Sequence, residues 1–185
     1  MIDAHPVVLI TGISASGKST IADLLARRFE RGVHVKGDVF RRMVVRGRVE
    51  MSASPSADAW AQLRLRYRLG AATADAYHAA GFSVVVQDVV VGAVLQEYVD
   101  MIHSRPCYVV VLTPRPEVVT QREAGRAKVA YRDGAPTIEA LDDALRMETP
   151  RLGLWIDTSD QTPDETVDEI IERSDQARVH NAVDV

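Results

Sequence analysis

A glycine-rich loop between an apolar run and a helical stretch constrains the fold of this chain more than any other feature. Residues 7–11 are apolar and predict a buried strand, and residues 18–31 carry apolar side chains at helical spacing. Between them, residues 12–19 read Gly-Ile-Ser-Ala-Ser-Gly-Lys-Ser, which matches the pattern G-x-x-x-x-G-K-[ST]. A strand that turns through glycines into a helix is typical of a parallel sheet covered by helices.

Each position of this pattern has a physical task in holding phosphate groups. The glycines let the backbone turn tightly and aim its N–H groups inward, and the following helix adds the positive end of its dipole. Lys18 would reach the β- and γ-phosphates, and the Ser19 hydroxyl would ligate Mg²⁺. The sequence therefore predicts a loop that binds ATP and magnesium. The residues expected to contact the nucleotide are Gly12, Ile13, Ser14, Ala15, Ser16, Gly17, Lys18, Ser19 and Thr20.

The rest of the chain alternates short β-rich runs with helical stretches. These runs are apolar on both faces, as expected for parallel strands with helices on either side. Further strands are expected at residues 33–36, 82–88, 107–113 and 154–157. The prediction is a three-layer α/β fold of the P-loop NTPase type, with a five-stranded parallel sheet flanked by helices.

Domain organisation follows from length and local composition. The chain has 185 residues, enough for one compact domain, which we expect to cover residues 1–175. Residues 125–136 are polar and basic and predict a small mobile lid, and residues 176–185 predict a flexible C-terminal tail.

Charge and cysteine content narrow the class of protein. A net charge of -4 does not favour a bulk electrostatic contact with nucleic acid or with an acidic membrane. The N-terminus lacks a basic region ahead of an apolar run, and we expect no membrane span. The single cysteine, Cys107, lies in an apolar strand and fits a reducing compartment, so a cytoplasmic location is expected.

Carboxylates stand at the ends of two predicted strands, where ligands bind in open parallel sheets. Asp38 could accept the proton of a substrate hydroxyl as it attacks the γ-phosphate, and its alternative role is that of a helix N-cap. Asp88 could orient Mg²⁺ through water or bind the acceptor, and its alternative role is that of a polar strand end facing water.

These features together resemble the chloramphenicol phosphotransferase family of small P-loop kinases. The resemblance rests on the P-loop, on Gly37-Asp38 after the second strand, and on residues 84–90 at the third strand. Its wider setting is the superfamily of nucleoside monophosphate, gluconate and shikimate kinases. The resemblance implies ATP in the P-loop, a hydroxyl acceptor near Asp38, and Asp38 as the base.

The resemblance also implies an arginine pair ahead of the lid, which matches Arg122 and Arg126. Arg122 would stack on or flank adenine, and Arg126 would reach toward the phosphates and act in catalysis. Residues four apart share a helix face, and a transferring phosphoryl group needs such cations. The alternative is a solvated basic helix end. Lys128 and Arg132 follow in the loop and could swing in on closure.

The predicted function is that of an ATP-dependent kinase that phosphorylates a hydroxyl of a sugar, a nucleoside or an antibiotic-like molecule. The spacing Gly37-Asp38-x-x-Arg41 resembles adenylate kinases, so Arg41 is a candidate acceptor contact and a nucleotide or nucleoside kinase stays an alternative. The Asp-Gly-aromatic-Pro-Arg run of nucleotide-accepting enzymes is not present at residues 87–92. A non-catalytic ATP-binding module is the third candidate. The expected partner is a small-molecule acceptor, with the chain a monomer or a small homo-oligomer.

Overall fold

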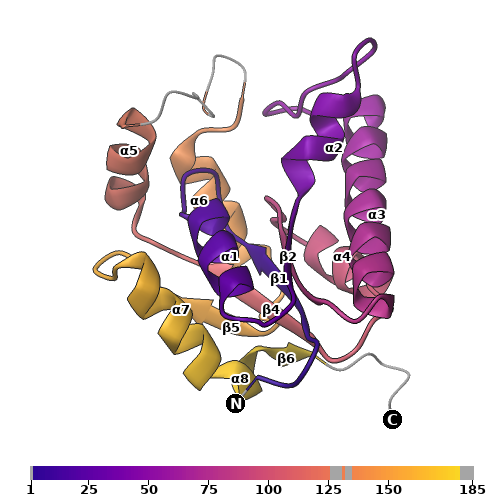
Figure 1. The fold of residues 1–185 in the computed structure, drawn as a ribbon. Helices are drawn as coiled ribbons and strands as arrows, with labels where there is room; N and C mark the ends of the chain where they lie inside the picture. Colours follow the sequence, from indigo (N-terminus) through magenta and orange to yellow (C-terminus); the bar gives the residue numbers. More distant parts are fainter. Residues whose placement is uncertain (1, 126–130, 132–134, 180–185) are drawn as a thin grey trace.

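The computed structural model describes residues 2–125, 131 and 135–179 and contains one twisted sheet (Figure 1). Five strands run parallel in the order β2-β3-β1-β4-β5, and a short β6 pairs antiparallel with β4. The strands are β1 (Val7–Thr11), β2 (Gly32–Lys36), β3 (Ser83–Gln87), β4 (Cys107–Leu112), β5 (Leu154–Ile156) and β6 (Arg178–Val179). The predicted five-stranded parallel α/β fold is confirmed.

Helices cover both faces of this sheet. They are α1 (Lys18–Arg27), α2 (Gly37–Met43), α3 (Ala57–Ala79), α4 (Val94–Met101), α5 (Pro116–Ala124), α6 (Ile138–Met147), α7 (Pro163–Glu172) and α8 (Ser174–Ala177). Within the described ranges, no helix is both long and apolar enough to cross a membrane.

The alternation of side chains along each strand creates two separate cores. One β1 face sends Val8 and Ile10 toward α1, α7 and α8, and the other sends Val7 and Leu9 toward α3, α4, α5 and α6. Both sets of side chains are fully buried, which explains why β1 is apolar on both of its faces. The sheet is therefore the middle layer of three.

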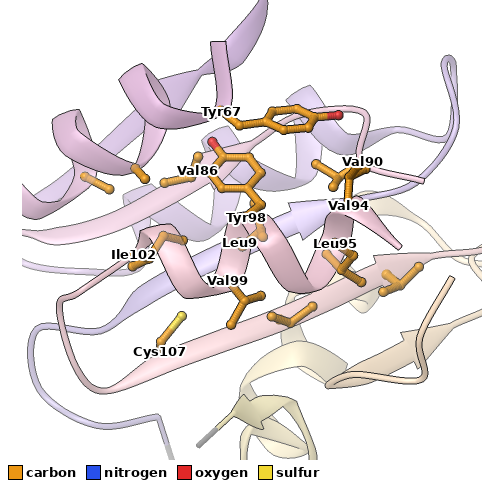
Figure 2. Close-up of a cluster of buried hydrophobic side chains, with 14 of the residues drawn as sticks. Leu9, Tyr67, Val86, Val90, Val94, Leu95, Tyr98, Val99, Ile102 and Cys107 are labelled. Atoms are coloured by element: carbon orange, nitrogen blue, oxygen red, sulfur yellow. The ribbon is translucent and has the colours of Figure 1, made fainter. Parts of the chain in front are cut away.

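A stacked pair of tyrosines fixes α3 and α4 over the carboxyl end of β3 (Figure 2). The rings of Tyr67 and Tyr98 lie 4.8 Å apart between centroids, and the Tyr67 hydroxyl donates a 2.8 Å hydrogen bond to the Val89 carbonyl. Gly70 leaves room for this stack, because a Cβ there would lie 2.2 Å from the Tyr98 hydroxyl oxygen. The long helix α3 is thereby held beside the residues that follow β3.

The C-terminal boundary differs from the sequence-based prediction. Residues 176–179, expected to begin a flexible tail, instead complete α8 and form β6. Ala177 and Val179 are buried, and Val179 lies opposite Cys107 in the sheet. A two-residue strand carries no periodicity of its own, so only its partner β4 reveals it. Residues 180–185 lie outside the described part.

His34 on β2 makes stability sensitive to pH. Its side chain is 7% exposed and its Nδ1 lies 3.7 Å from an Asp23 carboxylate oxygen. Neither ring nitrogen has a hydrogen-bond partner in the described part of the chain. Burial, and then the nearby charge of Lys36, lower the pKa of His34 below its ordinary value of 6.5. The unfolded chain therefore takes up this proton first as the pH falls, which favours unfolding.

We expect the free energy of unfolding to fall as the pH drops below 6.5, until the folded protein also protonates His34. The slope is at most about 1.4 kcal/mol per pH unit for one proton. Urea denaturation between pH 7.5 and 5 measures it, and His34→Gln should flatten that part of the curve. An unchanged slope in the variant would assign the effect to other groups.

Candidate functional site

A cleft of about 1340 Å³ opens at the carboxyl ends of β1, β2 and β3. The glycine-rich loop lines it together with Asp38, Asp88, Arg41 and Arg122. Parallel strands present such an edge for ligands where neighbouring connections diverge. The structure thus brings these sequence-predicted residues into one cleft, and Arg126 lies outside the described residues.

Residues 12–17 form a tight cradle ahead of α1. Gly12 and Gly17 have φ angles of +144° and +99°, and a Cβ on Gly12 would lie 2.6 Å from the Leu112 carbonyl oxygen. Lys18 is buried, and its ammonium donates a 2.6 Å hydrogen bond to the Ile13 carbonyl across the loop. No side chain within the described residues caps α1, so the amides of its first turn can bind an anion.

Asp38 stands in the first turn of α2, directly after β2. Its carboxylate forms ion pairs of 3.0 Å with both Arg41 and Arg42. The N-cap of α2 is Lys36, so the alternative role of Asp38 as the N-cap is wrong. The side chain is 27% exposed and lines the cleft. A carboxylate in this position can accept a proton from a bound hydroxyl.

Asp88 is buried directly after β3, so its alternative role as a strand end facing water is also wrong. One carboxylate oxygen accepts a hydrogen bond from the Val89 amide at 2.7 Å and forms an ion pair with the Arg66 guanidinium at 2.8 Å. The other oxygen is buried and has no hydrogen-bond partner among the described residues. Burial raises the pKa of the Asp88 carboxyl, whereas the Arg66 guanidinium acts in the opposite direction.

Arg66 also lies at the site, although it is not among the site residues that the sequence predicts. Its side chain is 14% exposed on α3 and forms the ion pair with Asp88. The signal was present in the helical spacing, since Arg66 lies three residues after Leu63 and four before the buried Gly70. An arginine at the edge of a buried helix face needs a counter-charge, and Asp88, directly after β3, provides it.

Arg122 on α5 lies against the glycine-rich loop. Its guanidinium donates to the Ser16 carbonyl at 3.3 Å and to the Thr158 carbonyl at 2.9 Å. The Tyr131 hydroxyl donates to the Ser14 carbonyl at 3.0 Å, so it also contacts this loop. Arg126, Lys128 and Arg132 of the predicted lid lie outside the described residues. Of the predicted arginine pair, the structure therefore locates one member.

A family model described as an AAA domain, AAA_33, matches residues 7–150, which include the glycine-rich loop, Asp38, Asp88 and Arg122. The chain belongs to this family. The search of curated proteins found no match. The finer resemblance to chloramphenicol phosphotransferases stays a prediction.

Solved structures of small kinases share the fold of this AAA_33 chain. The Mycobacterium tuberculosis APS kinase, solved with AMPPNP and APS, has a TM-score of 0.68 at 19% identity, covering 94% of this chain and 99% of its own. A Janibacter sugar kinase has a TM-score of 0.66 at 19% identity, with coverages of 93% and 95%. A Sinorhizobium meliloti gluconokinase has a TM-score of 0.62 at 17% identity, covering 95% of each chain. At these identities the likeness shows the fold.

The residues of this AAA_33 chain fit a bound nucleotide and Mg²⁺. Gly12 leaves no room for a side chain, and the Lys18 ammonium already lies against the loop carbonyl that it would leave for a phosphate. Ser19 is exposed toward the cleft, and Asp88 has a buried carboxylate oxygen to satisfy. Mg²⁺ is commonly held by one or two protein oxygens together with nucleotide phosphates and water.

Gly37 directly precedes Asp38 and packs against the Asp88 carboxylate. A methyl group added at Gly37 therefore tests whether the two carboxylates must keep their relative positions. A Cβ at Gly37 would lie 2.0 Å from an Asp88 carboxylate oxygen, which Arg66 and the Val89 amide hold in place through the other oxygen. Gly37→Ala must therefore displace Asp88 or the start of α2. If catalysis requires the two carboxylates to keep their relative positions, turnover should fall about 10²-fold, as for misplacements near 1 Å.

The measurement pairs steady-state kinetics with thermal unfolding of the Gly37→Ala variant. A loss of turnover in a protein that still unfolds cooperatively near the native temperature supports displacement within the site. Turnover within a factor of two of the native value would show that catalysis does not depend on the relative positions of Asp38 and Asp88.

Proposed function

We propose that this protein is an ATP-dependent kinase that transfers the γ-phosphate of ATP to a hydroxyl group of a small molecule. The observation that carries the proposal is the meeting of the P-loop lysine and the Asp38 carboxylate in one cleft. A phosphoryl-transfer site needs a cation at the phosphates and a proton acceptor at the attacking hydroxyl. Membership of the AAA_33 family and the kinase fold of the structural neighbours support it.

Each residue has a proposed role in that reaction. The amides of residues 12–17 and the Lys18 ammonium would bind the β- and γ-phosphates, and the Ser19 hydroxyl would hold Mg²⁺, which offsets developing negative charge. Arg122 would flank the nucleotide, since it already contacts the loop and Thr158. Asp38 would take the proton of the attacking hydroxyl. Asp88 would hold a Mg²⁺-bound water or the acceptor through its unpartnered oxygen.

A panel assay tests the proposal. The protein is incubated with ATP, Mg²⁺ and sugars, nucleosides, nucleotides or hydroxylated antibiotics, and products are read by mass spectrometry for the mass of one phosphate. Phosphorylation of at least one acceptor is expected. Tight ATP binding without transfer to any acceptor would instead favour a nucleotide-binding regulatory module.

The nucleotide-kinase alternative depends on Arg41, which would have to bind an acceptor phosphate. Arg41 is paired with Asp38 at 3.0 Å and with Glu50, and its side chain is 27% exposed. To bind a phosphate bidentately, Arg41 would have to give up its contacts with these two carboxylates. We therefore favour acceptors other than nucleotides.

A further inference from the structure

The long helix α3 is apolar on its outward face as well as on its buried face. It packs on β2, β3, α2 and α4 through the side on which Tyr67 and Ala74 are buried. On the opposite side, exposed apolar residues follow one another at steps of four, three, four and three residues, which is the spacing of a coiled-coil contact. We call this row the α3 seam, and its members are Leu65, Leu69, Ala72, Ala76 and Ala79.

A groove of about 440 Å³ runs beside the C-terminal half of the α3 seam. Its walls come from α3 and from Phe82, whose ring packs against the edge of Tyr77 with 5.8 Å between ring centroids. The lining is apolar apart from the hydroxyl groups of Thr73 and Tyr77. Figure 1 shows α3 along one side of the molecule, so a second molecule can reach this groove. The groove has room for an apolar side chain from such a molecule.

Large and small side chains occupy opposite halves of the α3 seam, and a second copy of the chain complements both halves. If two α3 helices pack antiparallel about a two-fold axis, Leu65 of each copy faces Ala76 of the other. Leu69 then faces Ala72. Each layer holds one leucine and one alanine, so the helices keep one separation along the contact. A parallel pair would set leucine on leucine at one end and alanine on alanine at the other, and would splay apart.

Charges beside the α3 seam favour the same register. Arg68 is exposed, and none of the ion pairs among the described residues includes it. Asp75, two turns further on, has His103 as its one ion-pair partner in the described part of the chain, and that histidine is charged only if protonated.

In the antiparallel arrangement, Arg68 of each copy lies beside Asp75 of the other, because both residues flank the α3 seam on the same side. Moving the partner by seven residues in either direction would instead set Arg68 against Arg68 or Asp75 against Asp75. Exposed ion pairs add little affinity, but like charges in contact disfavour the wrong registers. Side-chain size and charge therefore favour one and the same arrangement.

We propose that two copies of this chain form a dimer through their α3 seams, antiparallel about a two-fold axis. Leu65 of each copy inserts beside Ala76 of its partner, at the apolar groove. One helix pair buries a small area, so the dimer is reversible, with a Kd on the order of micromolar. Leu65 and Leu69 also line the outer part of the cleft, so the partner helix borders its opening. The proposal stands on the outward face of α3 and does not depend on the proposed function.

Sedimentation of the full-length chain from about 1 to 200 μM tests the association. The expected result is a shift with concentration from the chain mass of 20.3 kDa toward twice that mass. A monomer throughout this range would overturn the proposal and leave the α3 seam to a different protein.

A charged side chain in the α3 seam tests which surface forms the dimer. Leu69→Glu should weaken the association at least about 10-fold, since both copies would bring a carboxylate into the apolar contact near the axis. Leu69 is 40% exposed in the single chain, so thermal unfolding of the variant should stay near that of the native protein.

The matched control is Val45→Glu, since Val45 is also apolar, is 97% exposed and lies outside the linings of the cleft and the groove. This variant should associate like the native chain. Association that survives Leu69→Glu, or that Val45→Glu weakens equally, would place the contact elsewhere and overturn the proposal.

Disulfide cross-linking tests the orientation of the two helices. A mixture of the Leu65→Cys and Ala76→Cys variants should form a covalent heterodimer under mild oxidation, because the two positions face each other. Neither variant alone should cross-link, since equivalent positions lie about 16 Å apart along the helix axis. The native Cys107 is buried and does not compete. Cross-linking of Leu65→Cys with itself, or no product from the mixture, would overturn the antiparallel arrangement.

Discussion

Replacing Asp38 with asparagine should lower turnover by roughly 10²–10⁴-fold while leaving ATP affinity nearly unchanged. The amide keeps the size of the side chain and can still accept a hydrogen bond from Arg41, whose Nε lies 3.0 Å from the carboxylate. It cannot take the proton of an attacking hydroxyl. Initial rates with the true acceptor and calorimetric titration with an ATP analogue measure the two quantities.

A second aspartate provides the matched control for this substitution. Asp58 is exposed in the first turn of α3 and does not line the cleft, so Asp58→Asn should leave the rate unchanged. Native turnover in Asp38→Asn would remove Asp38 from the proposed mechanism. Because Asp38 also pairs with Arg42, thermal unfolding of the variant separates a catalytic loss from a local rearrangement of α2.

Replacing Lys18 with methionine should lower turnover by about 10²–10³-fold and weaken ATP binding. Methionine keeps much of the length and apolar contact of the stem, and it removes the ammonium that lies 2.6 Å from the Ile13 carbonyl. The β- and γ-phosphates would lose the cation proposed to stabilise them as charge develops. Rates at saturating acceptor, measured over a range of ATP concentrations, separate the effects on turnover and on affinity.

The control removes a positive charge from the other end of the same helix. Arg28, the C-cap of α1, pairs with Asp168 at 2.8 Å outside the cleft. Arg28→Met is therefore expected to affect stability slightly and turnover not at all. Equal losses from the two substitutions would indicate a general electrostatic effect in place of a specific role for Lys18.

Most helices and strands lie close to where the sequence predicts them, and each difference has a physical cause. The helix at Ile138–Met147 has the bounds that its local sequence predicts, because Thr137 caps it and its apolar side chains recur at helical spacing. The predicted helix over residues 18–31 ends at Arg27 instead, ahead of Gly32, where a Cβ would lie 1.8 Å from the Ala26 carbonyl oxygen. The local sequence pattern does not predict this close approach of two backbone segments.

The roles of the two aspartates could not be decided from the sequence. The sequence placed Asp38 and Asp88 at strand ends but left a local alternative for each. Both local alternatives proved wrong, since Lys36 is the N-cap and Asp88 is buried. Deciding between the roles required knowing what packs on each carboxylate, and those neighbours come from other elements.

The sequence by itself determined the phosphate-binding loop and the parallel α/β sheet, because their signals are local. Every group of the loop lies within residues 12–19, and the central strands at residues 7–11, 83–87 and 107–112 are nearly continuous apolar runs. Only the tertiary structure decided which charged side chains of the cleft pair with one another. Arg66 meets Asp88 because α3 packs over the end of β3, and Arg41 meets Glu50 because residues 44–56 return beside α2. An ion pair between two elements depends on how those elements pack, and no local sequence motif predicts that packing.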